Sequence, residues 1–265
     1  MQSILEKASK AHIIEKPFPH LAIQNALDAE LYEELIHEFP SIDMFRNGGN
    51  FSSKTGRYFY PAHNTLSNQQ ISPLWHKFIA YHLSQRFYRQ VISLFGDYIR
   101  ALHPDLESKL GKSLEDLESN IRFKEEFKHI ALECQLVYSL PNSKPSIIIG
   151  PHLDRAVALY AGLLYFRLDD DDSTGGDFEL YRFKSRHRFI EETRRVPERY
   201  VEKVKTVPYQ KNTLVLFPHS PDSVHGVSVR SASRYPRLHV NFVGELEIPL
   251  YDLSQYYEVL SVSKS

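Results

Sequence analysis

Residues 131–154 read ALECQLVYSLPNSKPSIIIGPHLD. Two apolar runs in this stretch are separated by a segment rich in serine and proline. Short apolar runs bounded by Pro, Asn and Ser are typical of buried β-strands, since a helix needs a longer run at helical spacing. His152 and Asp154 follow the second run directly. The stretch therefore predicts a strand-rich region that ends in two polar side chains with ligating atoms.

The same pattern continues towards the C-terminus. Further short segments are apolar or alternating and are separated by Pro, Gly, Asn and Asp: Leu159–Leu168, Phe178–Phe183, Thr213–Phe217, Val227–Val229 and Leu238–Val243. Many short strands with such boundaries predict a β-sandwich or jelly roll. The stretch Lys184–Lys205 is crowded with Arg, Lys and Glu and lacks alternation, so we expect an exposed, partly helical excursion there.

The part before residue 131 has a helical pattern. Asn25–Asp28 predicts a turn with a capping residue, followed by a helix that ends at Pro40. Ser72-Pro73 predicts the start of one long helix, because serine is a good N-cap and proline suits the first helical turn. Residues 113–121 are predicted as a short third helix, and the polar residues 46–70 as a long loop.

These patterns predict an α+β protein with a mainly β core and a helical N-terminal layer packed on it. We expect one domain, in which residues 1–130 are mainly helical, 131–248 form the core and 249–265 form a C-terminal tail. A chain of 265 residues that is 42% hydrophobic can bury one sizeable core.

Composition restricts the classes of partner. The formal net charge is −1, whereas binding to nucleic acid or an anionic membrane usually leaves a basic excess. The one cysteine, Cys134, permits no intrachain disulfide. The N-terminus lacks the apolar stretch of a signal peptide, and no apolar run reaches about 18 residues. We therefore expect a soluble, cytoplasmic protein.

Three residues are candidate metal ligands. His152 and Asp154 stand two apart, so that in a strand they would point to the same face. His225 follows the apolar segment Thr213–Phe217 and completes two imidazoles and one carboxylate, the facial triad of non-haem iron(II) oxygenases. His219 is the alternative for the third ligand, and the other histidines are expected to be structural.

Several segments then follow in a characteristic order: QLVY at 135–138, HLD at 152–154, GLLYF at 162–166, GGDFELY at 175–181, LVLF at 214–217, HGV at 225–227 and RLHVNF at 237–242. In this order they resemble the catalytic double-stranded β-helix of the Fe(II)/2-oxoglutarate-dependent dioxygenase superfamily, in its prolyl-4-hydroxylase-like branch. The opening KPFPHLAIQNAL at 16–27 also resembles the start of many bacterial members. The resemblance implies a jelly-roll core that binds Fe(2+) through His152, Asp154 and His225.

The resemblance also implies a site for the co-substrate. In the family, a basic residue after the second histidine binds the distal carboxylate of 2-oxoglutarate, and Arg234 and Arg237 are the candidates. We prefer Arg237, because it shares a strand face with His239, and a guanidinium fork can hold both carboxylate oxygens. His239 stands where the family usually has a small hydroxyl residue. Tyr138 matches a tyrosine that often contacts the same carboxylate, and a core aromatic is its alternative role.

The implied activity is hydroxylation of an unactivated C–H bond, with release of succinate and CO2. The expected partners are O2 and a small polar metabolite, while a protein side chain remains open as the substrate. Asp154 argues against halogenation, since related halogenases replace this carboxylate by Gly or Ala. The alternatives are a cupin-like metalloenzyme that does not use 2-oxoglutarate and a catalytically silent binding module of the same fold.

Two other motifs have simpler interpretations. The acidic run Asp169–Asp172 could be a second metal site, but we expect a solvated hairpin turn. Gly175-Gly176 predicts a turn with positive φ rather than a phosphate loop, because no helical pattern follows it.

Overall fold

The largest sheet is organised around β11 (Arg237–Leu246), whose residues alternate between two environments. The even-numbered residues from 238 to 242 belong to the hydrophobic core beside the helices. Arg237 and His239 line a cavity on the opposite face. This alternation confirms the strand face that the sequence predicted, and it follows from the period of two in a β-strand. The computed structural model describes residues 1–124 and 126–257.

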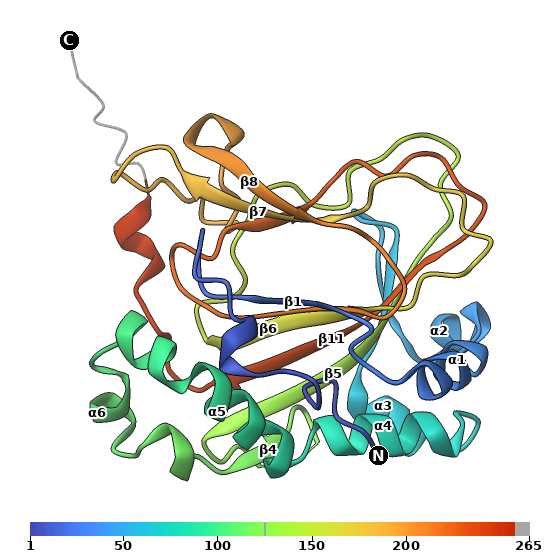
Figure 1. Cartoon of the computed structure of the whole chain (residues 1–265), viewed down its shortest axis with the longest axis horizontal. Helices are drawn as coiled ribbons and strands as arrows, with labels where there is room; N and C mark the ends of the chain where they lie inside the picture. Colours follow the sequence, from blue (N-terminus) through green and yellow to red (C-terminus); the bar gives the residue numbers. More distant parts are fainter. Residues whose placement is uncertain (125, 258–265) are drawn as a thin grey trace.

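Two sheets face each other above a layer of helices (Figure 1). The eight-stranded sheet has the order β1-β9-β6-β11-β5-β3-β2, with β4 paired in parallel to β5. Its strands are β1 (Leu21–Gln24), β2 (Asn50–Ser52), β3 (Arg57–Tyr60), β4 (Ser119–Ile121), β5 (Ile130–Ser139), β6 (Ala158–Tyr165), β9 (Thr213–Pro218) and β11. The three-stranded sheet has the order β10-β7-β8, with β7 (Phe178–Phe183), β8 (Val201–Val207) and β10 (His225–Val227). The sheets are therefore mostly antiparallel, and the prediction of a β-rich core is confirmed.

The helices cover one face of the eight-stranded sheet (Figure 1). They are α1 (Ala29–His37), α2 (Ile42–Gly48), α3 (Ala62–Ser67), α4 (Pro73–His82), α5 (Gln85–Leu102) and α6 (Leu106–Leu110), with 3-10 turns η1 (Lys10–His12), η2 (Leu114–Asp116), η3 (Glu198–Tyr200) and η4 (Leu253–Tyr256). The prediction of one long helix from Ser72 onwards was wrong, because the chain breaks between α4 and α5. Ser84 caps the second of these helices by accepting a hydrogen bond from the backbone N–H of Phe87, at 3.3 Å.

Three other sequence predictions need correction. The predicted loop 46–70 contains α3, the end of α2 and the hairpin β2–β3, which joins the large sheet through pairing of β3 with β5. The predicted third helix at 113–121 is the short turn η2 followed by β4. The predicted excursion Lys184–Lys205 includes most of β8, which pairs with β7 along its length. Each error includes a short strand, and such strands depend on packing against the rest of the sheet more than on local propensity.

Smaller differences concern the ends of the core. Ile147–Ile149 forms no strand, and the chain there makes only single backbone contacts, such as Val227 N–H to the Ile149 carbonyl at 2.9 Å. The predicted tail 249–265 contains η4, and residues 258–265 lie outside the described part of the chain.

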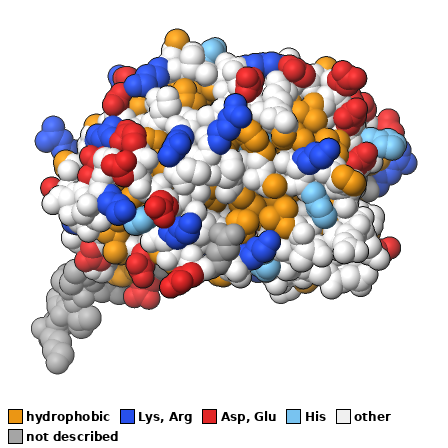
Figure 2. Space-filling model, turned by 90° about the horizontal axis from the view of Figure 1, so that it is seen from below, with side chains coloured by type: hydrophobic (Ala, Val, Ile, Leu, Met, Phe, Trp, Pro, Cys, Tyr) orange, Lys and Arg blue, Asp and Glu red, His pale blue; other side chains and the backbone are white. Residues whose placement is uncertain are grey.

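Acidic and basic side chains are interspersed over the face that is seen from below in Figure 1 (Figure 2). Hydrophobic atoms lie between them, and neither sign of charge dominates this view. In the described residues, no helix combines the length and the apolar character that a membrane crossing requires.

Candidate active site

The backbones of His152 and His225 are directly paired. The N–H of His152 donates to the carbonyl of His225 at 2.8 Å, and the reverse hydrogen bond measures 3.1 Å. Between the two polar residues of the HLD segment, Leu153 is 1% exposed and packs with Ile190 and Val224. In place of the predicted strand, the structure has this isolated bridge at His152. The buried Leu153 fixes the segment, while the side chains of His152 and Asp154 on either side of it point to one place.

The side chains of His152, Asp154 and His225 meet at one point. Each offers one ligand atom, and these three atoms lie within 4.8 Å of one another. His225 Nε2 is 3.6 Å from Asp154 Oδ2, and the two imidazole centroids are 4.4 Å apart. In the described part of the chain, no other group of three His, Cys, Asp or Glu side chains has this geometry.

The orientation of both imidazoles suits metal binding. His152 Nδ1 lies 2.9 Å from the Gly150 carbonyl, and His225 Nδ1 lies 2.9 Å from the Ser223 carbonyl. Because a carbonyl only accepts, both Nδ1 atoms carry a proton, so Nε2 is the atom of each ring that has a lone pair for a metal when the imidazole is neutral. Burial and the neighbouring His225 lower the pKa of His152 to about 3. Burial alone would raise the pKa of Asp154, but the two histidines lower it below its usual value. Two imidazoles and a carboxylate form a donor set that suits a divalent transition metal.

A cavity of about 130 Å³ lies between the two sheets beside these ligands. This volume is below the roughly 300–1,000 Å³ of pockets for drug-sized ligands, so the cavity suits a small molecule. Its walls come from both sheets: Arg57, Ile149, His152, Asp154, Ala161, Gly162, Leu163, Phe178, Phe217, His225, Val227, Arg237, His239, Asn241 and Val243.

Arg237 is a buried cation in this cavity, and none of the described residues provides a counter-ion for it. Its side chain is enclosed, with the residue 1% exposed. Its Nε donates to the Gly176 carbonyl at 3.0 Å, its Nη2 to the Tyr165 hydroxyl at 3.0 Å, and its Nη1 to Nδ1 of His239 at 3.2 Å. These acceptors are neutral, and among the described residues no carboxylate pairs with Arg237. Two of its five N–H groups remain for a ligand.

The neighbours of Arg237 hold its guanidinium in place. The rings of Tyr165 and Tyr209 lie 4.9 and 5.0 Å from its carbon Cζ. Because His239 Nδ1 accepts from Arg237, its proton is on Nε2, which makes this imidazole a hydrogen-bond donor. Burial and Arg237 lower the pKa of His239 well below its usual value, so the ring is neutral.

Tyr138 does not belong to the cavity. Arg237 pairs with Ser139 in the sheet, so that Tyr138 points to the other face, where its ring packs 5.4 Å from that of Phe45 in the helical layer. The predicted contact of Tyr138 with a co-substrate is therefore corrected to its alternative role as a core aromatic, since neighbours in a strand face opposite sides. Tyr165, which the sequence analysis did not single out, contacts Arg237 instead.

His219 and Arg234, the alternatives for the third metal ligand and for the carboxylate-binding arginine, lie away from the triad and the cavity. His219 is buried, with Nε2 2.8 Å from the Tyr251 hydroxyl and Nδ1 3.0 Å from Ser223 Oγ. Both of its nitrogens are thus engaged away from the triad. Arg234 is exposed and lies over the ring of Tyr235, 5.1 Å from its centroid, as predicted for a residue in the turn.

Arg57 is a cavity residue that sequence analysis missed. It stands at the start of β3, inside the predicted loop, and its pairing with Ser139 places it in the same cross-strand row as Arg237. Burial, together with the charge of Arg237, lowers the pKa of Arg57 to about 10, so that it remains a cation at neutral pH. Only the sheet reveals this neighbourhood, because the three paired residues are far apart in sequence.

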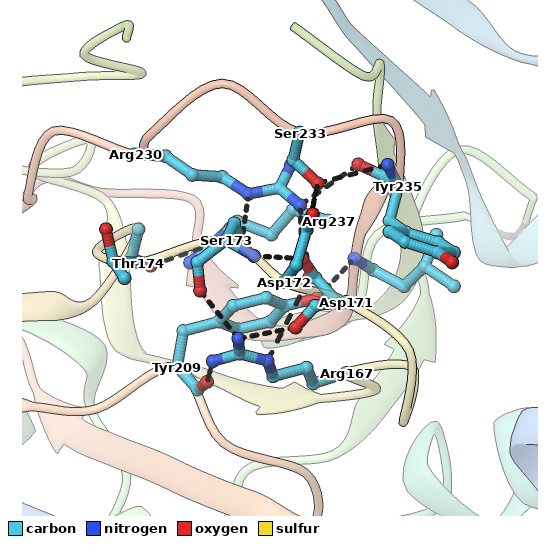
Figure 3. A network of polar contacts seen from close by, with 12 residues as sticks. Arg167, Asp171, Asp172, Ser173, Thr174, Tyr209, Arg230, Ser233, Tyr235 and Arg237 are labelled. Carbon is cyan, nitrogen blue, oxygen red and sulfur yellow. Dashed lines mark hydrogen bonds and ion pairs between the residues drawn. The ribbon is translucent and has the colours of Figure 1, made fainter.

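Behind Arg237 lies a network of buried polar groups (Figure 3). Arg230 pairs with Asp171 at 3.0 Å, and its Nε donates to Ser173 Oγ at 3.0 Å. Asp171 is 6% exposed, which corrects the expectation that the whole acidic run is solvated. Because the partner of Asp171 is an arginine, it has no ligand role, and the run is not a second metal site.

The turn after this run has the predicted backbone. Gly175 and Gly176 both have φ of +73°. A Cβ on Gly175 would lie 1.9 Å from the Val229 carbonyl oxygen, so no other residue fits this close approach. The turn thereby brings the Gly176 carbonyl to Arg237.

No family model matches the sequence, and no curated protein matches it. Solved structures are similar to its fold. A prolyl-4-hydroxylase from Pseudomonas putida is 14% identical, with 86% of this chain and 93% of that chain covered and a TM-score of 0.47. A prolyl hydroxylase from Trichoplax adhaerens, solved with a peptide fragment of hypoxia inducible factor, is 12% identical, with 86% and 84% covered and a TM-score of 0.46. The alpha-ketoglutarate-dependent epimerase SnoN of nogalamycin biosynthesis is 13% identical, with 85% and 76% covered and a TM-score of 0.46.

These identities and TM-scores assign no substrate or reaction to the chain. The likeness to these two prolyl hydroxylases and to this epimerase is one of fold.

Proposed function

We propose that this protein is an iron(II)- and 2-oxoglutarate-dependent oxygenase that hydroxylates a C–H bond of a small polar molecule. In this proposal His152, Asp154 and His225 hold the iron, and Arg237 binds the distal carboxylate of the co-substrate. The two facing sheets would form the double-stranded β-helix of such enzymes.

One observation supports the proposal above all. A cavity whose walls carry a metal-ligand triad also contains Arg237, a buried guanidinium for which the described residues provide no counter-ion. An unpaired charge in an enclosed site is costly, and a carboxylate ligand would offset that cost. A triad without the arginine would support many metalloenzymes, whereas the two together favour one that binds a carboxylate beside its metal.

The residues of the triad fit iron(II). The two imidazoles present Nε2 atoms whose direction is set by backbone carbonyls, and the lowered pKa of Asp154 keeps the carboxylate ionised. Three protein ligands leave positions for a bidentate co-substrate and for O2. When bound, iron(II) supplies the redox chemistry by which 2-oxoglutarate and O2 give succinate and CO2 while one oxygen atom enters the substrate.

The rest of the cavity binds and orients. Arg237, held by Gly176 and Tyr165, receives the distal carboxylate with a guanidinium that does not need to reorganise. His239 offers its Nε2–H as a further donor in place of the usual small hydroxyl. Leu163, Phe178 and Phe217 line the cavity with apolar surface and exclude water.

The test is a comparison of ligand binding and product release. Purified protein should bind one iron(II), then 2-oxoglutarate, and should release succinate slowly without a substrate and faster with a metabolite extract that contains one. Iron binding without any affinity for 2-oxoglutarate would favour the cupin-like metalloenzyme. If the protein bound neither iron(II) nor 2-oxoglutarate, the result would favour a catalytically silent binding module of the same fold.

A further inference from the structure

Arg57 is a second guanidinium in the cavity, and it has no hydrogen-bond or ion-pair partner among the described residues. No hydrogen bond or ion pair joins its side chain to any other described residue, and its Nε atom is enclosed without an acceptor. The Phe59 ring lies 5.1 Å from Cζ and provides only a cation–π contact. A buried arginine normally has a carboxylate or several carbonyls around it.

The surroundings of Arg57 also lack a counter-charge. Ser139 pairs with it across the sheet, and the buried hydroxyl of this serine has no hydrogen-bond partner either. Among the described residues that line the cavity, Asp154 is the one with an acidic side chain, and it belongs to the triad. Two unpartnered polar groups side by side in one sheet row indicate the place of a polar ligand.

The positions of the two arginines differ in depth. Arg237 is 1% exposed, whereas Arg57 is half-buried. A neighbouring groove of about 460 Å³ shares Ile149 with the cavity and is lined by Lys54 and Thr55, from the same hairpin as Arg57. Arg57 is therefore close along the chain to residues that line this groove.

If the proposed function holds, the sum of charges in the occupied cavity also indicates that Arg57 binds an anion. A divalent ion and the two arginines face Asp154 and the two carboxylates of 2-oxoglutarate. One positive charge is then left without a counter-charge. It belongs to Arg57, because Arg237 binds the co-substrate in the proposed function and the Nε atom of Arg57 has no acceptor among the described residues. A guanidinium fork matches a carboxylate in shape and charge.

We infer that Arg57 binds a carboxylate of the primary substrate, which is therefore a monoanionic carboxylic acid rather than a neutral or cationic molecule. The contact holds the substrate by its anionic end at the rim of the cavity, with its carbon skeleton towards the triad. Arg57 thus selects the class of substrate, while Arg237 is reserved for the co-substrate.

The experiment uses manganese(II) in place of iron, with 2-oxoglutarate present and acetate as the probe. Acetamide, of the same size but without charge, is the matched control. Manganese accelerates the relaxation of methyl protons on any probe that binds beside it, so that binding is read by NMR without turnover. We expect wild-type protein to bind acetate roughly tenfold or more tightly than acetamide, since a hydrogen-bonded charge is lost in the amide.

The variants separate Arg57 from its neighbours. Arg57→Gln should lower acetate binding roughly tenfold or more and leave 2-oxoglutarate affinity unchanged. Arg57→Lys should bind acetate with intermediate strength, because it keeps the charge but not the fork. Arg46→Gln, an exposed arginine paired with Asp43 outside the cavity, should bind both probes as the wild type does. Unchanged thermal unfolding of each variant would show that it is folded.

Equal acetate binding by wild type and Arg57→Gln, or equal binding of acetate and acetamide, would overturn the inference. So would a loss of 2-oxoglutarate affinity in Arg57→Gln, because Arg57 would then bind the co-substrate. If 2-oxoglutarate fails to bind wild-type protein, the proposed function fails instead. The dependence of acetate binding on Arg57 would still be measurable in that case.

Discussion

Arg230 and Arg237 are two fully buried arginines on the same side of the protein, and they differ in how their charges are balanced. Arg230 is paired with the buried Asp171 and also donates to Ser173 and to the Tyr235 carbonyl (Figure 3). Arg237 has only neutral acceptors around it. The first charge is balanced within the protein, and the second is left for a ligand.

This difference separates groups that stabilise the fold from groups that prepare a site. A buried ion pair such as Arg230–Asp171 is costly to break, because removal of one partner leaves the other charge buried without a counter-charge. An unpaired buried cation such as Arg237 costs stability in the free protein, and a bound carboxylate offsets this cost. Loss of the Arg230 pair should therefore lower the stability of the fold, whereas loss of Arg237 should lower ligand binding.

The largest effect is expected at the metal. His225→Ala should abolish stoichiometric iron binding and all turnover, because two ligands remain where three are needed, while the fold should persist. Metal analysis after gel filtration would measure the first effect, and circular dichroism the second. His219→Gln, whose side chain contacts Tyr251 and Ser223, should keep its iron. If the histidine variants behaved the other way round, His219 would be the third ligand.

The next largest effect should come from Asp171. Asp171→Asn should lower the free energy of unfolding by roughly 3–5 kcal/mol, because it leaves Arg230 buried without a counter-ion. Urea denaturation would measure the change. The control is Asp169→Asn, since Asp169 is exposed and pairs with Lys211 on the surface, and such pairs contribute about 0–1 kcal/mol. Equal effects of the two variants would remove the distinction between a buried pair and a surface pair.

Arg237→Gln should act on binding rather than on stability. Its affinity for 2-oxoglutarate should fall by roughly 2–5 kcal/mol, because a buried carboxylate loses its charged partner. Its free energy of unfolding should stay the same or rise, since no internal carboxylate is left unpaired. Equilibrium binding to the metal-loaded protein and urea denaturation would measure the two quantities. Arg234→Gln should change neither, and a strong loss of affinity in this control would mean that the wrong arginine was chosen.

A smaller effect is expected from His82, a buried group that stays uncharged. It is enclosed between α4 and the N-terminal segment, and burial lowers its pKa from 6.5 to about 3. Between these values the unfolded chain binds the proton and the folded protein does not, so stability falls as the pH falls below 6.5. At about pH 5 this one group should cost about 2 kcal/mol.

His82→Gln tests this contribution, because glutamine can still accept from the Ile4 N–H and does not titrate. The difference in unfolding free energy between about pH 7 and about pH 5 should shrink by about 2 kcal/mol in the variant. An unchanged difference would assign the acid sensitivity to other buried histidines, such as His20 and His103, whose pKa values burial also lowers.

The candidate ligands and Arg237 could be predicted because their signals are local. His152 and Asp154 stand two residues apart, and the alternation of β11 separates Arg237 and His239 from the apolar face over a few residues. Tyr138 was misplaced because the corresponding information is not local. Its strand face depends on the register of β5 against β11, and a shift by one residue reverses the direction of every side chain.

The sequence by itself determined the mainly β character of the core, the helical layer and three side chains able to hold a metal. These features follow from periodicity and residue type, which are local properties of the chain. Tertiary structure alone decided what surrounds them. Arg57 reaches the cavity only because the hairpin β2–β3 pairs with β5. The charge of Arg230 has a counter-charge only because the fold places Asp171 beside it. Whether a buried charge meets a counter-charge depends on contacts between distant segments. No local pattern records them.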